Sequence, residues 1–158
     1  MKRFLQLVTE LCSLVGFPEP RHLLAGEAMR HEDVNFAMTV NPQSDADALL
    51  LYADFGCLDL ENKAMLYPLM LKENFMMTMA SRNCTFAVSE THDSVVLIER
   101  LSLSLTTSHS LLAQMRAIAH KANYFNKQHR RLQPAAFRAT PLNAALLRSE
   151  LATHHAAS

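Results

Sequence analysis

The first fifteen residues separate apolar from polar side chains around a helix. At about 100° per residue, the apolar side chains fill close to half of the circumference. They are Phe4, Leu5, Leu7, Val8, Leu11, Cys12, Leu14 and Val15. Gly16 and Pro18 then end the helix. This face is wider than the roughly 100° stripe that a surface helix needs for its own core. We therefore expect it either to be covered on both sides within the domain or to contact a partner as well.

The next third of the chain changes from helical to strand periodicity. Residues 17–33 contain prolines, a glycine and charged residues, and they predict a connection with one irregular turn. Residues 34–40 alternate large apolar side chains at period two, which predicts a strand, and 41–45 predict the following turn. The continuous apolar run at 48–56 is typical of a central strand covered on both faces, and 57–60 predict a short third strand.

A second helix and a second hairpin follow. Residues 61–76 place Met65, Leu66, Leu69, Met70 and Phe75 on one side of a helix, which Pro68 is expected to kink or restart. Residues 84–88 and 94–105 predict an antiparallel pair around a turn at 89–93. One face of its second strand carries Val95, Leu97, Leu101, Leu103 and Leu105.

The last strong element is a helix over about 107–127. Thr107 or Ser108 can cap it, and apolar residues then recur at helical spacing. The recurring set is Leu111, Leu112, Met115, Ile118, Ala119, Ala122 and Phe125. The predicted order is therefore α-β-β-β-α-β-β-α. This is an α+β sandwich in which helices flank a twisted antiparallel sheet.

Length and charge divide the chain into a body and a tail. Its 158 residues, 49% hydrophobic and 19% charged, suit one globular domain. Through Ser104 there are 8 Lys/Arg against 14 Asp/Glu, and from Leu105 onward 7 against 1, so the formal charge of zero divides into −6 and +6. We predict a folded domain over 1–128 and a basic, largely flexible tail over 129–158, with one short helix near 142–151.

The sequence predicts a cytoplasmic protein. Apolar runs such as 48–52 are far shorter than the roughly 20 residues that a membrane span needs, so no span is expected. Polar residues interrupt the apolar N-terminal stretch, unlike a signal peptide. Three widely spaced cysteines, Cys12, Cys57 and Cys84, suit reduced thiols better than a disulfide framework.

No arrangement of residues typical of catalysis is found in the sequence. With three glycines, the chain has no P-loop and no GxGxxG turn, and it has no GxSxG elbow. Its eight histidines never form HxxxH or HExxH, and no cysteine pair has zinc-ligand spacing. Cys12 lies on the apolar side of the first helix, so we expect a buried thiol with a raised pKa. We predict no enzyme, no catalytic residue, no metal site and no cofactor.

Methionines are concentrated in and after the second predicted helix. Five of the nine lie within residues 65–79. Flexible thioethers form surfaces that adapt to different apolar partners, although methionine also fills gaps in cores. This segment is therefore a candidate contact surface.

The element order and several segments resemble class I type III secretion chaperones of the Tir-chaperone (CesT/SycE-like) family. The resemblance rests on the amphipathic first helix, the Leu71-Lys72-Glu73-Asn74-Phe75 segment that closes the second helix, and the hairpin before the last helix. It covers residues 1 to about 128. It implies a homodimer in the bacterial cytoplasm that uses no ATP itself. Such a chaperone binds an extended N-terminal segment of one or more secreted effectors and keeps them soluble and secretion-competent.

The resemblance also implies which residues do this work. The effector contacts that it implies are Leu5, Val8, Leu11, Cys12, Val15, Phe86 and Val88. The dimer contacts that it implies are Met65, Leu66, Leu69, Met70 and Phe75. An extended client can add to a sheet edge while its apolar side chains enter pockets.

The basic tail has no counterpart in the family. It is a candidate contact for the secretion-system ATPase or for an acidic client segment. It also leaves open an alternative, a small regulatory or structural homodimer whose tail binds nucleic acid or a protein. The acidic body argues against a nucleic-acid face, because phosphate binding needs clustered cations.

Overall fold

The chain folds into one antiparallel sheet with helices packed against it. The computed structural model describes residues 1–41, 45–58, 63–89, 91, 94–129, 132–133 and 143–144. Its elements are α1 (Lys2–Val15), α2 (Pro20–Leu24), β1 (Met29–His31), β2 (Val34–Asn41), β3 (Asp45–Leu58), α3 (Lys63–Met79), β4 (Cys84–Ser89), β5 (Ser94–Ser102), α4 (Ser108–His129) and β6 (Leu132–Gln133). The α+β class predicted from the sequence is confirmed.

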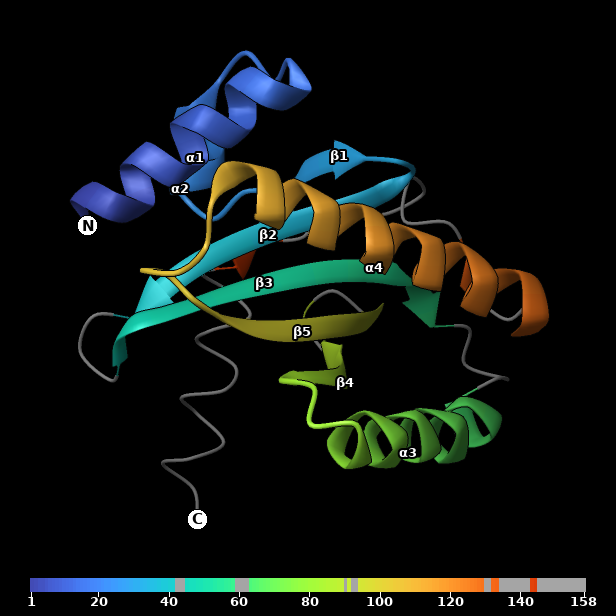
Figure 1. Ribbon diagram of the computed structural model, residues 1–158. Coiled ribbons are helices and arrows are strands. Elements are labelled where there is room, and N and C mark those ends of the chain that lie inside the picture. The colour runs from blue at the N-terminus through green and yellow to red at the C-terminus, as the bar shows by residue number, and fades with distance from the viewer. Residues whose placement is uncertain are drawn as a thin grey trace.

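The strands lie in the order β1-β2-β3-β5-β4, so that β3 and β5 form the middle of the sheet (Figure 1). All of these pairings are antiparallel, and β6 adds to the end of β3. In the central register Tyr52 of β3 lies opposite Ala37 of β2 and Ile98 of β5. Alternate residues of β3 therefore point to opposite faces.

One face, here called the first face, carries the main core. Helices α1 and α4 lie over this face, and α3 lies beside β4 at the far edge (Figure 1). The strand β3 contributes Leu49, Leu51, Ala53 and Phe55 to this core, and all four are buried. The helices contribute Phe4, Leu7, Val8, Leu11, Leu66, Met70, Met77, Leu111, Met115, Ile118, Ala119, Ala122 and Phe125.

The opposite face, here called the second face, carries a smaller core. Ala37, Tyr52 and Val96 are buried together on it, and Ala144 belongs to the same cluster. The continuous apolar run of the central strand is thus explained, because side chains on both faces are removed from water.

Helix α1 has a defined C-terminal end, and helix α4 has a defined N-terminal end. At the end of α1, Gly16 adopts the left-handed conformation at φ 70°, and the N–H of Phe17 donates to the carbonyl of Cys12 at 2.9 Å. Before α4, the hydroxyl of Thr107 accepts from the N–H of Ser110 at 3.1 Å, while the Ser110 hydroxyl accepts from the Thr107 N–H at 2.9 Å. Thr107, one of the two predicted caps, therefore makes this reciprocal contact.

Two segments differ from the sequence-based prediction at their boundaries. Residues 17–33, expected to be a connection, contain the short elements α2 and β1. Cys57 and Leu58, expected in a separate third strand, are the last residues of the long strand β3, whereas Asp59 and Leu60 lie outside the described residues. Three strands precede α3 as predicted, because β1 takes the place of the missing one.

The second strand of the later hairpin was predicted too long. We expected it to reach Leu105, but β5 ends at Ser102 and Leu105 is 83% exposed. The reason is a turn held by Asp47, whose carbonyl accepts from the N–H of Leu103 at 2.7 Å and whose carboxylate accepts from that of Ser104 at 2.7 Å. These bonds redirect the chain toward α4.

Helix α3 is continuous through Pro68. A proline lacks the N–H that would bond to the carbonyl four residues earlier, and its ring crowds that carbonyl. Pro68 is exposed, so the ring lies on the outer side of the helix. None of the described helices is both long and apolar enough to cross a membrane.

A glycine fixes an irregular point in the middle of the sheet. The register between β3 and β5 shifts between Asp54 and Gly56, and Gly56 has φ 123°. Residues with a Cβ are excluded from most of this region. The Gly56 N–H donates to the Asp54 carboxylate at 2.9 Å, which secures the bulge.

Gly56→Ala should therefore destabilise the fold by about 1–3 kcal/mol, because alanine has to adopt a strained conformation or lose the bulge. Urea unfolding followed by circular dichroism measures the loss. Gly16→Asn is the matched control: it also has positive φ, but asparagine tolerates the left-handed region and an added Cβ meets nothing within 4 Å. Equal losses in the two variants would contradict the special role of Gly56.

Candidate protein-binding surfaces

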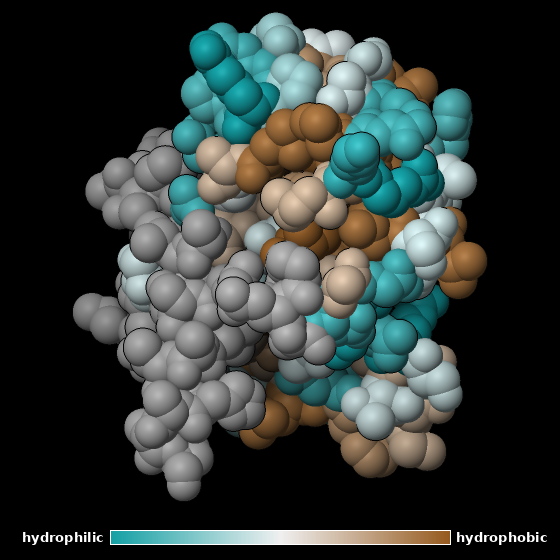
Figure 2. All heavy atoms as spheres, turned by 90° about the vertical axis from the view of Figure 1, so that its left-hand side faces the viewer, coloured by the Kyte–Doolittle hydropathy of each residue, from teal (hydrophilic) through white to brown (hydrophobic). Residues whose placement is uncertain are grey.

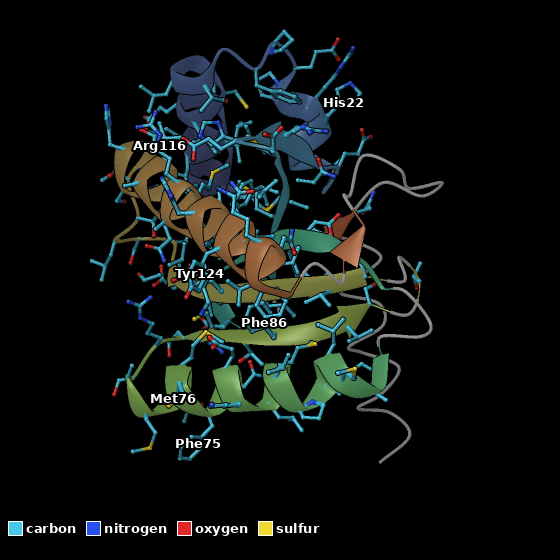
Figure 3. The ribbon with its side chains drawn as sticks, turned by 90° about the vertical axis from the view of Figure 1, so that its right-hand side faces the viewer. His22, Phe75, Met76, Phe86, Arg116 and Tyr124 are labelled. Atoms are coloured by element: carbon cyan, nitrogen blue, oxygen red, sulfur yellow. The ribbon has the colours of Figure 1, made fainter. Side chains whose placement is uncertain are left out.

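Helix α3 is apolar on its outer side as well as on its inner side. Leu66, Met70 and Met77 face the core and are buried. On the other side, six large apolar side chains are exposed: Met65 54%, Tyr67 41%, Leu71 69%, Phe75 63%, Met76 56% and Met79 69%. We call these six the outer face of α3. In Figure 3, Phe75 points away from the sheet. A helix that is apolar all round is normally buried all round, so this one lacks a covering partner within the described residues.

Asn74 attaches α3 to the edge of the sheet. Its side-chain carbonyl accepts from the N–H of Phe86 at 2.7 Å, and its side-chain amide donates to the carbonyl of Phe86 at 3.0 Å. Strand β4 is the last strand of the sheet, and the outward N–H and C=O of Phe86 would otherwise be open to another chain. The Asn74 side chain therefore takes the place of a neighbouring strand at this one position.

Three aromatic rings close the core beneath this attachment. Phe86 lies 4.9 Å from Phe55 and 5.5 Å from Phe125 between ring centroids. The ammonium group of Lys121 lies 5.4 Å from the centroid of Phe86 and 3.3 Å from the Glu73 carboxylate. These contacts join α3, β4 and α4, and they leave Phe86 only 3% exposed.

Helix α1 exposes one apolar side chain at each edge of its buried face. Leu5 is 52% exposed and Leu14 is 43% exposed, whereas the face between them is in the core. The guanidinium of Arg3 donates to the carbonyl of Thr106 at 2.7 Å and ties α1 to the turn before α4. On the side of the molecule where α1 begins, Figure 2 shows apolar residues at the surface among hydrophilic ones.

The residues predicted to contact an effector therefore lie in different environments. Val8, Leu11, Cys12 and Phe86 are buried within the chain, Val15 and Val88 are half-buried, and Leu5 is exposed. As the chain stands, the four buried side chains present no surface to a partner. The assignment of the seven as effector contacts stays a prediction.

The residues predicted to contact a second copy are also divided. Met65 and Phe75 belong to the outer face of α3, Leu69 is half-buried, and Leu66 and Met70 are in the core. The outer face also includes Met76 and Met79, which belong to the methionine-rich segment predicted as a contact surface, and Tyr67 and Leu71, which the sequence did not assign. A helical projection that considered the whole circumference of α3, and not only its most hydrophobic side, would have identified these residues.

A polar hollow lies where β3 begins and β5 ends. Its volume is about 190 Å³, and its lining includes Asp45, Asp47, Arg100 and Ser102. Asp45 pairs with Arg100, and Asp47 accepts from the Ser102 hydroxyl at 2.6 Å. The backbone N–H of Asp47 and the Arg100 guanidinium lower the pKa of Asp45, and the hydroxyl of Ser102 lowers that of Asp47. Both carboxylates are thus held ionised by partners that also join the two strands.

The thiols have the character expected of packed side chains. Burial raises the pKa of Cys12 and of Cys84, which keeps each protonated and weakly nucleophilic, and neither forms a disulfide. Burial also raises the pKa of Glu99, against the opposing effect of the hydrogen bond from Gln114. Among the described residues, no three His, Cys, Asp or Glu side chains are grouped to hold a metal ion.

One more titratable group lies at α2. Hydrogen bonds to Glu27 and Glu19 raise the pKa of His22, which contacts them at 2.7 Å and 2.6 Å. All three side chains are partly exposed to solvent. The cluster ties α2 to the start of the loop before β1 (Figure 3).

The fold is that of known secretion chaperones. Three solved structures are similar to this chain: the ExsC–ExsE complex, the Yersinia pestis type III secretion chaperone SycH with a fragment of YscM2, and the HopA1–SchA chaperone–effector complex. The first has a TM-score of 0.63 at 16% identity and covers 80% of this chain and 92% of the other. The second has a TM-score of 0.50 at 19% identity and covers 75% of this chain and 96% of the other. The third has a TM-score of 0.53 at 9% identity and covers 79% of this chain and 94% of the other. None of the curated proteins matches.

Residues 31–126, well over half of the chain, match the model of the Tir chaperone protein (CesT) family. The chain belongs to this family. The match runs from β1 to near the end of α4 and includes the outer face of α3 and the Asn74 attachment.

Asn74→Ala should lower the free energy of unfolding by about 1–3 kcal/mol, because both hydrogen bonds to Phe86 are lost and its peptide groups are left without partners. Urea unfolding measures the change. Asn74→Asp keeps the acceptor and loses the donor, so it should fall in between. Thr78→Ala, which removes one exposed hydroxyl from the same helix, is the control, and a loss as large as that of Asn74→Ala would contradict the proposed attachment.

Proposed function

We propose that the protein is a type III secretion chaperone that acts in the bacterial cytoplasm. It binds the N-terminal region of one or more secreted effectors in extended form and keeps them soluble and secretion-competent. The observation that carries the proposal is the family match over residues 31–126. The printed descriptions of the similar structures, a chaperone bound to an effector among them, support it.

The work assigned to the protein is binding rather than catalysis. The described surface offers apolar side chains on α3 and α1, and the groups with shifted pKa values are hydrogen-bonded or packed. A chaperone of this kind needs no cofactor, because it gains its free energy from contacts with the client.

We place the homodimer contact on the outer face of α3. A stable interface buries on the order of 800 Å² per partner and is apolar at its centre. Six large apolar side chains on one exposed helix face supply such a centre, and methionine and aromatic residues are enriched in interfaces. A two-fold arrangement would pair this face with its own copy.

We place the effector on exposed apolar positions of α1 and on the edge strand β4. Leu5 and Leu14 can receive apolar side chains of a client. On β4, the peptide groups of Val88 share the outward direction of those of Phe86, two residues earlier, and Asn74 does not reach them. An extended client would add to the edge there, and a dimer would offer this site twice to one client chain.

Phe75→Glu should convert a dimer into a monomer. A carboxylate at the centre of an apolar contact is buried without a partner, which costs several kcal/mol and raises the dissociation constant by at least about 100-fold. Light scattering after size exclusion should give twice 17.7 kDa for the wild type and 17.7 kDa for the variant. Ala113→Glu, at an exposed position of α4, is the control and should stay dimeric. A monomeric wild type, or a dimeric Phe75→Glu, would refute the α3 interface.

Leu5→Asp should weaken effector binding by at least about 10-fold, because an apolar contact is replaced by a solvated charge. The measurement is calorimetry with the N-terminal segment of an effector encoded by a neighbouring gene, after co-purification has identified one that binds. Ser13→Asp adds the same charge to the polar side of α1 and should bind as the wild type does.

The chaperone proposal fails if no effector segment co-purifies. Nucleic acid retained with an affinity that falls steeply with salt would then favour the regulatory alternative.

A further inference from the structure

The second face of the sheet is buried although none of the helices α1 to α4 contributes a side chain to its cluster. Tyr52 and Ala37 are 0% exposed and Val96 is 1% exposed, values equal to those of the first-face core. The helices α1, α3 and α4 contribute their buried side chains to the first-face cluster. In the part of the chain that the structure describes, the second-face cluster gains from outside the strands only Ala28 and Ala144.

Ala144 is distant in sequence from the buried residues of β2 and β3, and it is itself 0% exposed. Its N–H donates to the carbonyl of Gly26 at 2.7 Å, and the neighbouring Asn143 bridges to Glu27. This one bridge fixes Asn143 and Ala144 beside Gly26 and Glu27, just before β1, where the Ala144 side chain enters the second-face cluster.

A second attachment lies closer to α4. Strand β6 pairs with the end of β3, with Gln133 opposite Cys57 and Leu132 opposite Leu58. Figure 3 shows β6 following the last turn of α4. From Asp54 onward the same side of β3 pairs with β2, since Asp54 lies opposite Asn35. The next described residues of the chain, Asn143 and Ala144, lie at the second face.

The sequence on both sides of Ala144 has the composition to cover an apolar surface. Leu142 and Leu146 are four residues apart, as are Leu147 and Leu151, and one acidic residue occurs after residue 129. Leu50 and Ile98, which continue the second face beyond Tyr52 and Val96, are half-buried.

We infer that the second face is an interaction surface for an apolar segment, and that its resident occupant is the chain's own C-terminal segment at Asn143 and Ala144. The observations that carry this are the two backbone attachments, at β6 and at Asn143–Ala144, and the burial of Ala144 among Ala37, Tyr52 and Val96, a cluster to which none of α1 to α4 contributes. A tethered segment competes at high effective concentration, so any other chain that uses this face has to displace it. If the proposed chaperone function holds, the tail sets the affinity that a client segment needs to enter there.

The test uses Tyr52 as the reporter of the second face. The protein has no tryptophan and three tyrosines, and the other two, Tyr67 and Tyr124, are exposed. In the full-length Tyr67→Phe, Tyr124→Phe protein, only Tyr52 fluoresces. Ala144→Asp in this background should raise the acrylamide quenching constant of Tyr52 several-fold while the far-ultraviolet circular dichroism is retained. Ala117→Asp, the same substitution at an exposed position of α4, should leave quenching unchanged.

The inference is overturned if Tyr52 stays equally shielded in a folded Ala144→Asp protein. Deuterium exchange of the wild type tests it without any variant: the Ala144 amide should exchange at least about 10-fold more slowly than an unstructured peptide, and exchange at the unstructured rate would also overturn it. Both readouts need no effector, so their failure is distinct from failure of the chaperone function. Where an effector segment is in hand, Ala144→Asp should bind a segment that uses the second face several-fold more tightly, and unchanged affinity for such a segment would count against competition by the tail.

Discussion

The central strand β3 has to be covered on both faces, because it directs apolar side chains to each of them. Leu51 and Phe55 point to the first face and Tyr52 points to the second, and burial removes all three from water. On the first face this requirement is met by α1 and α4, which lie across the sheet. The long hairpin with β2 and the pairing with β5 hold the strand between two neighbours, and the bulge at Gly56 bends it near its end. The positions of the helices, the edge strand and the C-terminal attachments all follow from this strand.

The exposed apolar side chains of α3 lie on the side of the helix that the core does not need. Helix α3 covers the edge of the core next to β4 with one side and is attached there by Asn74. Its outer face contributes nothing further to the core and is nevertheless apolar. A chain under selection only for its own stability has no physical reason to keep six large apolar side chains at such positions. Membership of the CesT family gives this surface its proposed purpose.

Much of the fold could be predicted from the sequence, because its long elements have strong periodicity. The first helix, the central strand and the last helix were located to within a few residues. Strand β1 could not be predicted, since three residues carry no period and depend on pairing with β2. The end of β5 was missed because the turn that ends it is held by Asp47, which is distant in sequence.

The candidate site was harder to predict than the fold. Val8 and Leu11 belong to the same apolar sector as Leu5 in a helical projection, and only tertiary packing decides which of them is buried. The same holds for Met65 and Met70 in α3. The resemblance located the elements that carry the surfaces, but not the side of each element that is exposed. The attachment of Ala144 gave no signal, because one backbone hydrogen bond to Gly26 and one isolated bridge between Asn143 and Glu27 leave no pattern in side chains.

The sulfur content of the outer face of α3 has a chemical consequence. In the single chain Met65, Met76 and Met79 are all more than half exposed, so oxidants in solution reach their thioethers whenever the proposed dimer is dissociated. Oxidation to the sulfoxide makes a flexible apolar side chain polar, and methionine sulfoxide reductases reverse it. Buried Met70 and Met77 are shielded from the same reaction. An oxidised chain would therefore keep its fold while losing the apolar character of this one surface, which ties the state of that surface to the redox condition of its surroundings.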